Sequence, residues 1–258
     1  MNPPTNFKII NWLFCGLLLC LLTAATQAQT KPLVTRTDPP KSVLFIGNSF
    51  TFYNNAIYTH LRKLLVVEDP STRKEILLKS MTISGAKLSD HAGGLQQMLN
   101  SRPWDLIFLQ CHSREAFEDE MAPEFESTAR KFTKAIRAKG AEPVLFMTWA
   151  YVDQPKMITA QAKAIGRLGN SLNVMVVPVG LAFKHALKTI PGVILHDEDQ
   201  IHPSLAGTYL AAAVFYTSLY AKSPVKLDYD AGLDEELARQ LRQVAWDTVQ
   251  NYYHPTGD

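Results

Sequence analysis

Five short apolar runs recur along the chain, each rich in valine, isoleucine, leucine or phenylalanine and each ending in turn residues. They span residues 42–47, 75–80, 104–110, 143–149 and 174–179. A strand with one face in water alternates apolar and polar residues, whereas a strand covered on both faces is apolar at consecutive positions. The runs therefore predict five buried strands.

Amphipathic segments with helical spacing separate these runs, at residues 56–67, 88–99, 125–138 and 156–168. Two further helices are predicted after the last run, at 203–220 and 233–249. The alternation of strand and helix predicts an α/β fold, with a five-stranded parallel sheet between layers of helices. No internal repeat or change in composition interrupts this region, so residues 42–258 are predicted to form one domain.

The N-terminal part has a different pattern. Lys8 precedes an apolar stretch at residues 12–22, which passes into small residues up to Ala28. This order is typical of a secretory signal peptide, and it predicts cleavage after Ala28. A membrane anchor is the alternative, but a spanning helix needs about 20 apolar residues and this stretch is shorter. A lipoprotein would use Cys20, yet Leu19 stands where a small residue should precede it.

A secreted or periplasmic protein follows from this segment, with no stable membrane insertion once it is removed and with residues 29–41 as a linker. Of the three cysteines, only Cys111 then remains, so no internal disulfide is expected. About 230 residues would remain, enough to bury a core without covalent links. The formal net charge is +2, and no basic stripe indicates nucleic-acid binding.

The first candidate for chemistry is Ser49, which follows Gly47 and Asn48 at the end of the first run. In an open parallel sheet, functional loops lie beyond the carboxyl ends of the strands. A helix is predicted soon after, with Asn54 or Asn55 as its cap, and backbone N–H groups at a helix N-terminus favour developing negative charge. Ser49 is thus a candidate nucleophile, although a capping role alone also fits.

A second motif, Asp199-Gln-Ile-His202-Pro203, precedes an alanine-rich segment. Proline suits the first position of a helix, so the acid and the imidazole fall on the turn before it. A separation of three residues lets the carboxylate reach one ring nitrogen while the other faces the serine, as in a hydrolase triad. One alternative is a helix-initiating acid with a surface histidine. Another is a metal site of irregular spacing that would include His196, Asp197 and Glu198.

Together these motifs resemble the SGNH/GDSL hydrolase superfamily. The resemblance rests on the Gly-Asn-Ser block with its aromatic sequel, on a glycine after the second strand, and on the Asp-x-x-His-Pro block near the C-terminus. It implies a three-layer α/β/α, flavodoxin-like fold and metal-free, cofactor-free esterase chemistry. In that family the serine attacks an ester carbonyl, the histidine is the base, and the aspartate orients the histidine.

Carried over to this chain, the resemblance makes Ser49 the nucleophile, His202 the base and Asp199 its partner. The oxyanion hole would comprise the N–H groups of Ser49 and Gly85 and an amide side chain. Two departures stand out. The first block has asparagine in place of aspartate, and the Gly-x-Asn-Asp block expected after the third strand is missing. Gln110 is the candidate amide donor there, or else it merely ends a strand.

Two aromatic sets fall at the predicted active edge. Beside the candidate nucleophile lie Phe50, Phe52 and Tyr53, and just past the fourth strand lie Trp149 and Tyr151. Aromatic faces suit sugar rings or acyl chains, although such residues also fill cores. Cys111 and His112 are adjacent and so point to opposite faces of an extended segment, which disfavours a cysteine–histidine dyad.

The sequence thus predicts a secreted serine esterase that acts on a small-molecule or glycan ester, with an acetyl ester of a carbohydrate as the favoured substrate. The rival from another class is a non-catalytic module on the same fold, either flavodoxin-like or carbohydrate-binding. A flavodoxin-like loop after the first strand would hold a phosphate, but this one lacks the glycine and hydroxyl density of a phosphate cradle.

Overall fold

The computed structural model describes Met1 and residues 31–255, so the predicted signal peptide lies, apart from Met1, outside the described residues. The strands are β1 (Ser42–Gly47), β2 (Leu77–Thr82), β3 (Leu106–Gln110), β4 (Glu142–Phe146) and β5 (Met175–Val177). They form a five-stranded sheet in the order β2-β1-β3-β4-β5, and every pairing is parallel. This is the flavodoxin-like order, so the predicted fold class is confirmed.

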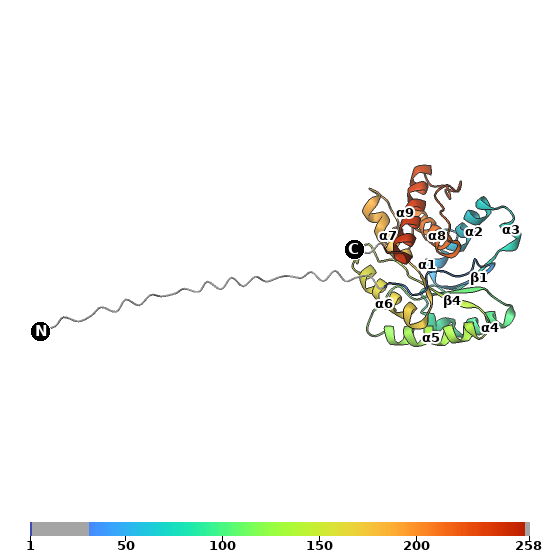
Figure 1. The fold of residues 1–258 in the computed structure, drawn as a ribbon, viewed down its shortest axis with the longest axis horizontal. Coiled ribbons are helices and arrows are strands. Elements are labelled where there is room, and N and C mark those ends of the chain that lie inside the picture. The colour runs from blue at the N-terminus through green and yellow to red at the C-terminus, as the bar shows by residue number, and fades with distance from the viewer. Residues whose placement is uncertain (2–30, 256–258) are drawn as a thin grey trace.

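Helices cover both faces of the sheet (Figure 1). They are α1 (Ser49–Phe52), α2 (Ile57–Glu68), α3 (Thr72–Glu75), the 3-10 turn η1 (Leu88–His91), α4 (Ala92–Ser101), α5 (Ala122–Arg137), α6 (Met157–Leu172), α7 (Val179–Thr189), α8 (Leu205–Tyr220) and α9 (Glu235–Tyr253). In Figure 1, α2, α7, α8 and α9 lie on one side of the sheet and α4, α5 and α6 on the other. The described residues include no helix long and apolar enough to cross a membrane.

The observed elements differ from the expected ones mainly at their ends. β4 stops at Phe146, and the rest of the predicted run forms the loop after the strand. The predicted helix at 88–99 divides into η1 and α4. The prediction missed α7, because the apolar run of β5 passes into this helix with only Pro178 between them. α8 begins at Leu205 with Ser204 as its cap, so Pro203 precedes the helix rather than starting it.

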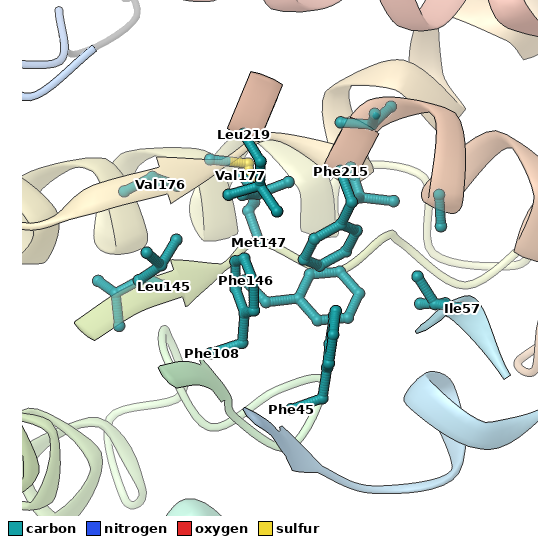
Figure 2. Packing of buried hydrophobic residues seen from close by; sticks show 14 of the residues in the cluster. Phe45, Ile57, Phe108, Leu145, Phe146, Met147, Val176, Val177, Phe215 and Leu219 are labelled. Carbon is teal, nitrogen blue, oxygen red and sulfur yellow. The ribbon is translucent and has the colours of Figure 1, made fainter. Parts of the chain in front are cut away.

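α8 explains why the C-terminal half folds back over the sheet. Nearly all of its residues are buried, and a helix that is apolar all round must be covered on every side. It packs against α2, α7 and α9, and Phe215 points from it to the rings of β1 and β3 (Figure 2). The Phe215 ring lies 5.4 Å from that of Phe45 and 4.7 Å from that of Phe108.

The described part of the predicted linker, residues 31–41, lies along the folded body. The Leu33 N–H donates to Oδ1 of Asn170 at 2.8 Å, and the Asn170 amide donates to the Lys31 carbonyl at 2.8 Å. Nearer β1, the Tyr220 hydroxyl donates to the carbonyl of Pro40 at 3.2 Å. The chain thus reaches the first strand along a defined surface path.

The aromatic cluster yields a stability prediction. Phe215→Ala should lower the free energy of unfolding by about 3–5 kcal/mol, because it removes buried apolar contacts and leaves a cavity among the remaining rings. Leu187→Ala on α7 is the control, since that side chain is 52% exposed and should cost little. Urea unfolding of both variants measures the difference. Equal small losses would contradict the role given to the cluster.

Candidate active site

Ser49 lies just after the inner strand β1, at the start of helix α1. Asn48 is the cap of α1, and its Oδ1 accepts from the N–H of Phe50 at 3.1 Å. The N–H of Ser49, as the first of the helix, has no partner within the helix. Gly47 is required before this turn, because a Cβ there would lie 2.8 Å from the Thr51 hydroxyl oxygen and would also strike the Gln110 side chain.

His202 and Asp199 face this serine from the loop before α8. Ser49 Oγ and His202 Nε2 are 2.8 Å apart, and His202 Nδ1 is hydrogen-bonded to Asp199 Oδ2. Because the carboxylate can only accept, Nδ1 carries the proton, and Nε2 is left as the acceptor for the serine hydroxyl. The structure therefore brings the three predicted residues into the order of a hydrolase triad.

The turn that carries the acid and the base is held from several sides. The other oxygen of Asp199 accepts from the N–H groups of Ile201 and His202, both at 2.9 Å. Gln200 adopts a left-handed conformation, with φ of 63°, and its carbonyl accepts from the N–H of Val152 at 3.1 Å. The Trp149 indole donates to the Ile201 carbonyl at 3.0 Å. The loop after β4 thus fixes the loop that holds the triad.

These contacts set the charge state of the acid. Desolvation is the largest influence and acts to raise the pKa of Asp199. The hydrogen bonds from the His202 ring and from the N–H groups of Ile201 and His202 outweigh it, and together they lower this pKa from 3.8 to about 2. The carboxylate is therefore ionised across the neutral range and able to orient a neutral or a protonated imidazole.

Gly85 lies on a tight turn next to the nucleophile loop. The N–H of Ala86 donates to the Ile83 carbonyl at 3.2 Å, and Gly85 has a φ of 68°, a conformation that side chains disfavour. The Asn48 amide donates to the Ala86 carbonyl at 3.2 Å, which ties this turn to the loop of Ser49. The turn that contains Gly85 is thus joined to the loop that carries Ser49.

Gln110 does not have the contacts expected of an oxyanion donor. It is 1% exposed, and its Nε2 donates to Asn48 Oδ1 at 2.5 Å and to the Cys111 carbonyl at 3.3 Å. Its Oε1 accepts from the Asn48 N–H at 3.2 Å and from the Thr51 hydroxyl at 2.6 Å. Both amide hydrogens are used in these two hydrogen bonds. In this structure Gln110 therefore stabilises the loop that carries Ser49 rather than presenting a free donor.

The aromatic residues also correct an expectation. Phe50 and Trp149 were expected to contact substrate, but they are 4% and 0% exposed. Their rings stack at 4.5 Å, and Trp149 stacks in turn on Phe183 at 4.4 Å. The three rings form a buried stack, and Phe50 at its end contacts the His202 imidazole. Tyr151 is half-buried, and its hydroxyl is hydrogen-bonded to that of Ser113.

Two further residues near the triad were not expected in their roles. The Tyr53 ring stacks on the imidazole of His202 with centroids 4.2 Å apart and planes 9° apart. Asn54 was expected as a helix cap, but α2 has Ala56 at its cap, and the Asn54 amide donates instead to the Pro203 carbonyl at 2.6 Å. No local signal reveals such contacts, because the partners are 149 residues apart in the case of Asn54.

Glu115 is a third unexpected residue. Its carboxylate is fully buried and accepts from the Leu88 N–H at 3.2 Å and from the His112 N–H at 2.8 Å. Burial raises the pKa of Glu115, against the opposing effect of these two donors. The contacts join the segment after the Gly85 turn to the segment after β3, so the two loops flanking the serine are held together.

The remaining candidates are accounted for more simply. Cys111 is 1% exposed, and burial raises the pKa of its thiol, so it is an unreactive core residue. Among the residues that the structure describes, no group of three or more histidine, cysteine, aspartate or glutamate side chains is arranged to hold a metal ion. His196, considered above for such a site, instead pairs through Nε2 with the Ala150 carbonyl at 2.9 Å.

Comparisons with known proteins place the fold. No protein-family model matches the sequence, and neither does any curated protein. A crystal structure of a DUF4886 family protein from Bacteroides uniformis matches with a TM-score of 0.70 at 20% identity, over 83% of this chain and 96% of that one. A protein from Slackia heliotrinireducens, assigned as an SGNH hydrolase, matches with a TM-score of 0.57 at 24% identity, over 68% of this chain and 97% of that one.

A catalytic mutant of an acetylxylan esterase from Geobacillus stearothermophilus also matches, with a TM-score of 0.57 at 17% identity, over 72% of this chain and 96% of that one. At these identities the likeness concerns the fold. The resemblance to the SGNH/GDSL superfamily inferred from the motifs is confirmed at that level. The chain therefore has the three-layer α/β/α fold of the SGNH hydrolases.

The Asp199 contacts predict a titration. In the native protein its carboxyl should titrate near pH 2, and in His202→Ala the midpoint should rise toward 3.8 because the strongest opposing hydrogen bond is lost. Since folding lowers this pKa, the ionised carboxylate stabilises the fold fully above about pH 4, and that contribution is lost as the pH falls toward 2. Carbon NMR of the labelled carboxyl gives both midpoints, with His185→Ala on α7 as the control. Identical midpoints in all three proteins would contradict the assignment.

The Gln110 contacts predict a loss of stability. Gln110→Leu leaves the Asn48 N–H and the Thr51 hydroxyl without partners, at about 1–3 kcal/mol for each buried group. The free energy of unfolding should therefore fall by about 2 kcal/mol or more, while the exposed Gln96→Leu should change it little. Denaturant unfolding measures both. An unchanged stability with a reduced turnover would instead restore Gln110 as an oxyanion donor.

Proposed function

We propose that this chain is a secreted serine esterase that removes acetyl groups from carbohydrates through a covalent acyl-enzyme. The observation that carries the proposal is the unbroken hydrogen-bond chain from Asp199 through His202 to Ser49. A binding module on this fold needs neither interaction: neither an acid that fixes the tautomer of a histidine nor a histidine that accepts a hydrogen bond from a serine. The chemistry of a nucleophile with its base explains both hydrogen bonds.

In the first half of the reaction, Ser49 Oγ attacks the ester carbonyl carbon while His202 Nε2 takes its proton. The carbonyl oxygen becomes an oxyanion, and the imidazolium formed is stabilised by the ionised Asp199. When the carbon–oxygen bond to the alcohol breaks, the proton on Nε2 passes to the leaving oxygen. The alcohol departs, and the acyl group remains on Ser49.

In the second half, water attacks the acyl carbonyl and gives its proton to His202 Nε2. Collapse of the second tetrahedral intermediate breaks the bond to Ser49 Oγ, which recovers its proton from the imidazolium. The acid is released, and the triad returns to its starting state. No redox step or external group is required.

The oxyanion would be held by backbone donors. The N–H of Ser49 is the first of the short helix α1 and has no partner within it. The N–H of Gly85 is the second donor, on a turn tied to the nucleophile loop through Asn48. With Gln110 engaged elsewhere, these two groups carry the stabilisation that the family pattern divides among three.

The substrate class rests on two kinds of support. Structures with this fold include proteins described as acetyl xylan esterases, which act on an acetylated glycan. The segment from Lys8 to Ala28 has the order of a secretory signal, and an exported protein meets polysaccharides outside the cytoplasm. An acetyl group also suits a nucleophile that is only 5% exposed.

The nucleophile assignment predicts the outcome of one substitution. Ser49→Ala should lower turnover of a small chromogenic acetate ester and of acetylated xylan by a factor on the order of 10⁴ or more, because the covalent route is lost. Release of p-nitrophenol and of acetate gives the two rates. The thermal midpoint should stay close to that of the native protein.

Ser101→Ala is the matched control. This hydroxyl lies at the end of α4, before β3 begins, and among the described residues it bonds only to the Met98 carbonyl. It should retain native turnover. The proposal fails if Ser49→Ala keeps native activity, or if the native protein hydrolyses neither ester. A preference for longer acyl chains would leave the esterase in place and overturn the acetyl assignment.

A further inference from the structure

The loop after the nucleophile helix reaches across to the residue after the base. The two hydrogens of the Asn54 amide go to the Pro203 carbonyl at 2.6 Å and to the Thr208 hydroxyl at 3.1 Å. Pro203 follows His202 directly, and Thr208 lies in the first turns of α8 and is fully buried. The Asn54 side chain therefore joins the loop that follows Ser49 both to the residue after His202 and to the first turn of α8.

The backbone at this point is held in a conformation that side chains disfavour. Asn54, Asn55 and Ala56 have φ values of 48°, 68° and 69°, three consecutive residues in the left-handed region. Asparagine tolerates this region better than other residues with side chains, but alanine does not. Such strain persists where surrounding contacts impose it, and it concentrates at functional sites.

A buried histidine supplies one of these contacts. His60 on α2 is 4% exposed, and its Nε2 is 2.8 Å from the Asn54 carbonyl oxygen while its Nδ1 is 2.7 Å from the Tyr229 hydroxyl. The carbonyl can only accept, so Nε2 donates and Nδ1 accepts from the tyrosine. Burial, the largest influence, lowers the pKa of His60 and keeps it in this neutral form. Asn54 is thus anchored through its backbone as well as its amide.

The preceding residue touches the base itself. The Tyr53 ring lies face to face on the His202 imidazole at 4.2 Å, while the edge contact of Phe50 with the same imidazole is at 5.6 Å and 77°. Two aromatic rings therefore restrict the plane of the imidazole. The position of the Tyr53 ring depends on the same loop that Asn54 ties to Pro203.

We propose that Asn54 is a positioning residue for His202: its amide, bonded to the Pro203 carbonyl, sets the register between the nucleophile loop and the base and keeps the Tyr53 ring against the imidazole. The assignment rests on the proposed esterase function, because it concerns the geometry of that reaction. Asn54 touches neither the ester nor the reacting atoms, and it acts through the distance from Ser49 Oγ to His202 Nε2.

The chain offers a matched pair of variants. Asn54→Gly removes the amide and keeps access to the left-handed region, so it separates the hydrogen bond from the backbone conformation. Asn55→Gly makes the same change at the next residue, which is exposed and shares the left-handed conformation, but whose side chain has no hydrogen bond within the described part of the chain. Asn54→Asp is a second test, because it preserves size but has no N–H to donate to Pro203.

Asn54→Gly and Asn54→Asp should lower kcat for the chromogenic acetate ester by about 10- to 100-fold with KM within about twofold, since a small displacement of the base affects the transition state more than ground-state binding. Asn55→Gly should stay within about twofold of the native protein in both. A general loss of structure would instead lower the amount of active enzyme, which titration of Ser49 with an organophosphonate measures directly. Turnover is therefore expressed per titrated site.

Proton NMR provides a readout that does not depend on hydrolysis. The Nδ1 proton of His202, bonded to a carboxylate, should give a far-downfield signal in the native protein and in Asn55→Gly, and this signal should shift or broaden in both Asn54 variants. If the Asn54 variants match Asn55→Gly in kcat and in this signal, the positioning role is wrong while the esterase assignment stands. If the native protein hydrolyses no ester, the proposed function fails. The NMR comparison still tests the contact itself: a His202 signal that is unchanged in both Asn54 variants would show that Asn54 does not position His202.

Discussion

The hydrogen bond between Ser49 Oγ and His202 Nε2 joins side chains that are 153 positions apart, and it tolerates only a few tenths of an ångström around its 2.8 Å length. Neither residue lies within a strand or a long helix. Ser49 follows the inner strand β1, which is paired on both edges, and His202 precedes α8, which is buried on nearly every face. A strand paired on both edges and a buried helix therefore hold the two ends of the bond.

The asparagine of the first motif has a physical explanation in this arrangement. Asn48 is 3% exposed, and its amide both accepts, from the Phe50 N–H and the Gln110 side chain, and donates, to the Ala86 carbonyl. Aspartate has no N–H for that carbonyl and would add a buried charge. Each side-chain oxygen and nitrogen of this neutral pair of amides has a hydrogen-bond partner, and such a network rigidifies its surroundings. The departure from the family pattern thus matches the presence of Gln110 beneath it.

Sequence reasoning succeeded where the signal is local or periodic. Consecutive apolar residues revealed the five strands, and the spacing within the Asp199–His202 turn revealed how an acid could reach the histidine. It failed where a contact depends on the folded arrangement. Phe50 and Trp149 look the same in sequence whether they face substrate or each other, and the partner of Asn54 is set by the packing of α8. A glutamine at a strand end likewise does not reveal which way its amide is directed.

The burial of these groups narrows how the site could stabilise charge. Because the Gln110 amide is hydrogen-bonded to Asn48 and Cys111, the proposed oxyanion donors are both backbone N–H groups. Each such donor contributes a factor of about 10² to 10³ to turnover. Backbone donors are fixed only as firmly as their loops. The Gly85 turn is therefore held twice, by Asn48 at the Ala86 carbonyl and by buried Glu115 at the Leu88 N–H. On this view the polar residues buried around Ser49 would act on the proposed reaction by limiting the movement of these peptide groups.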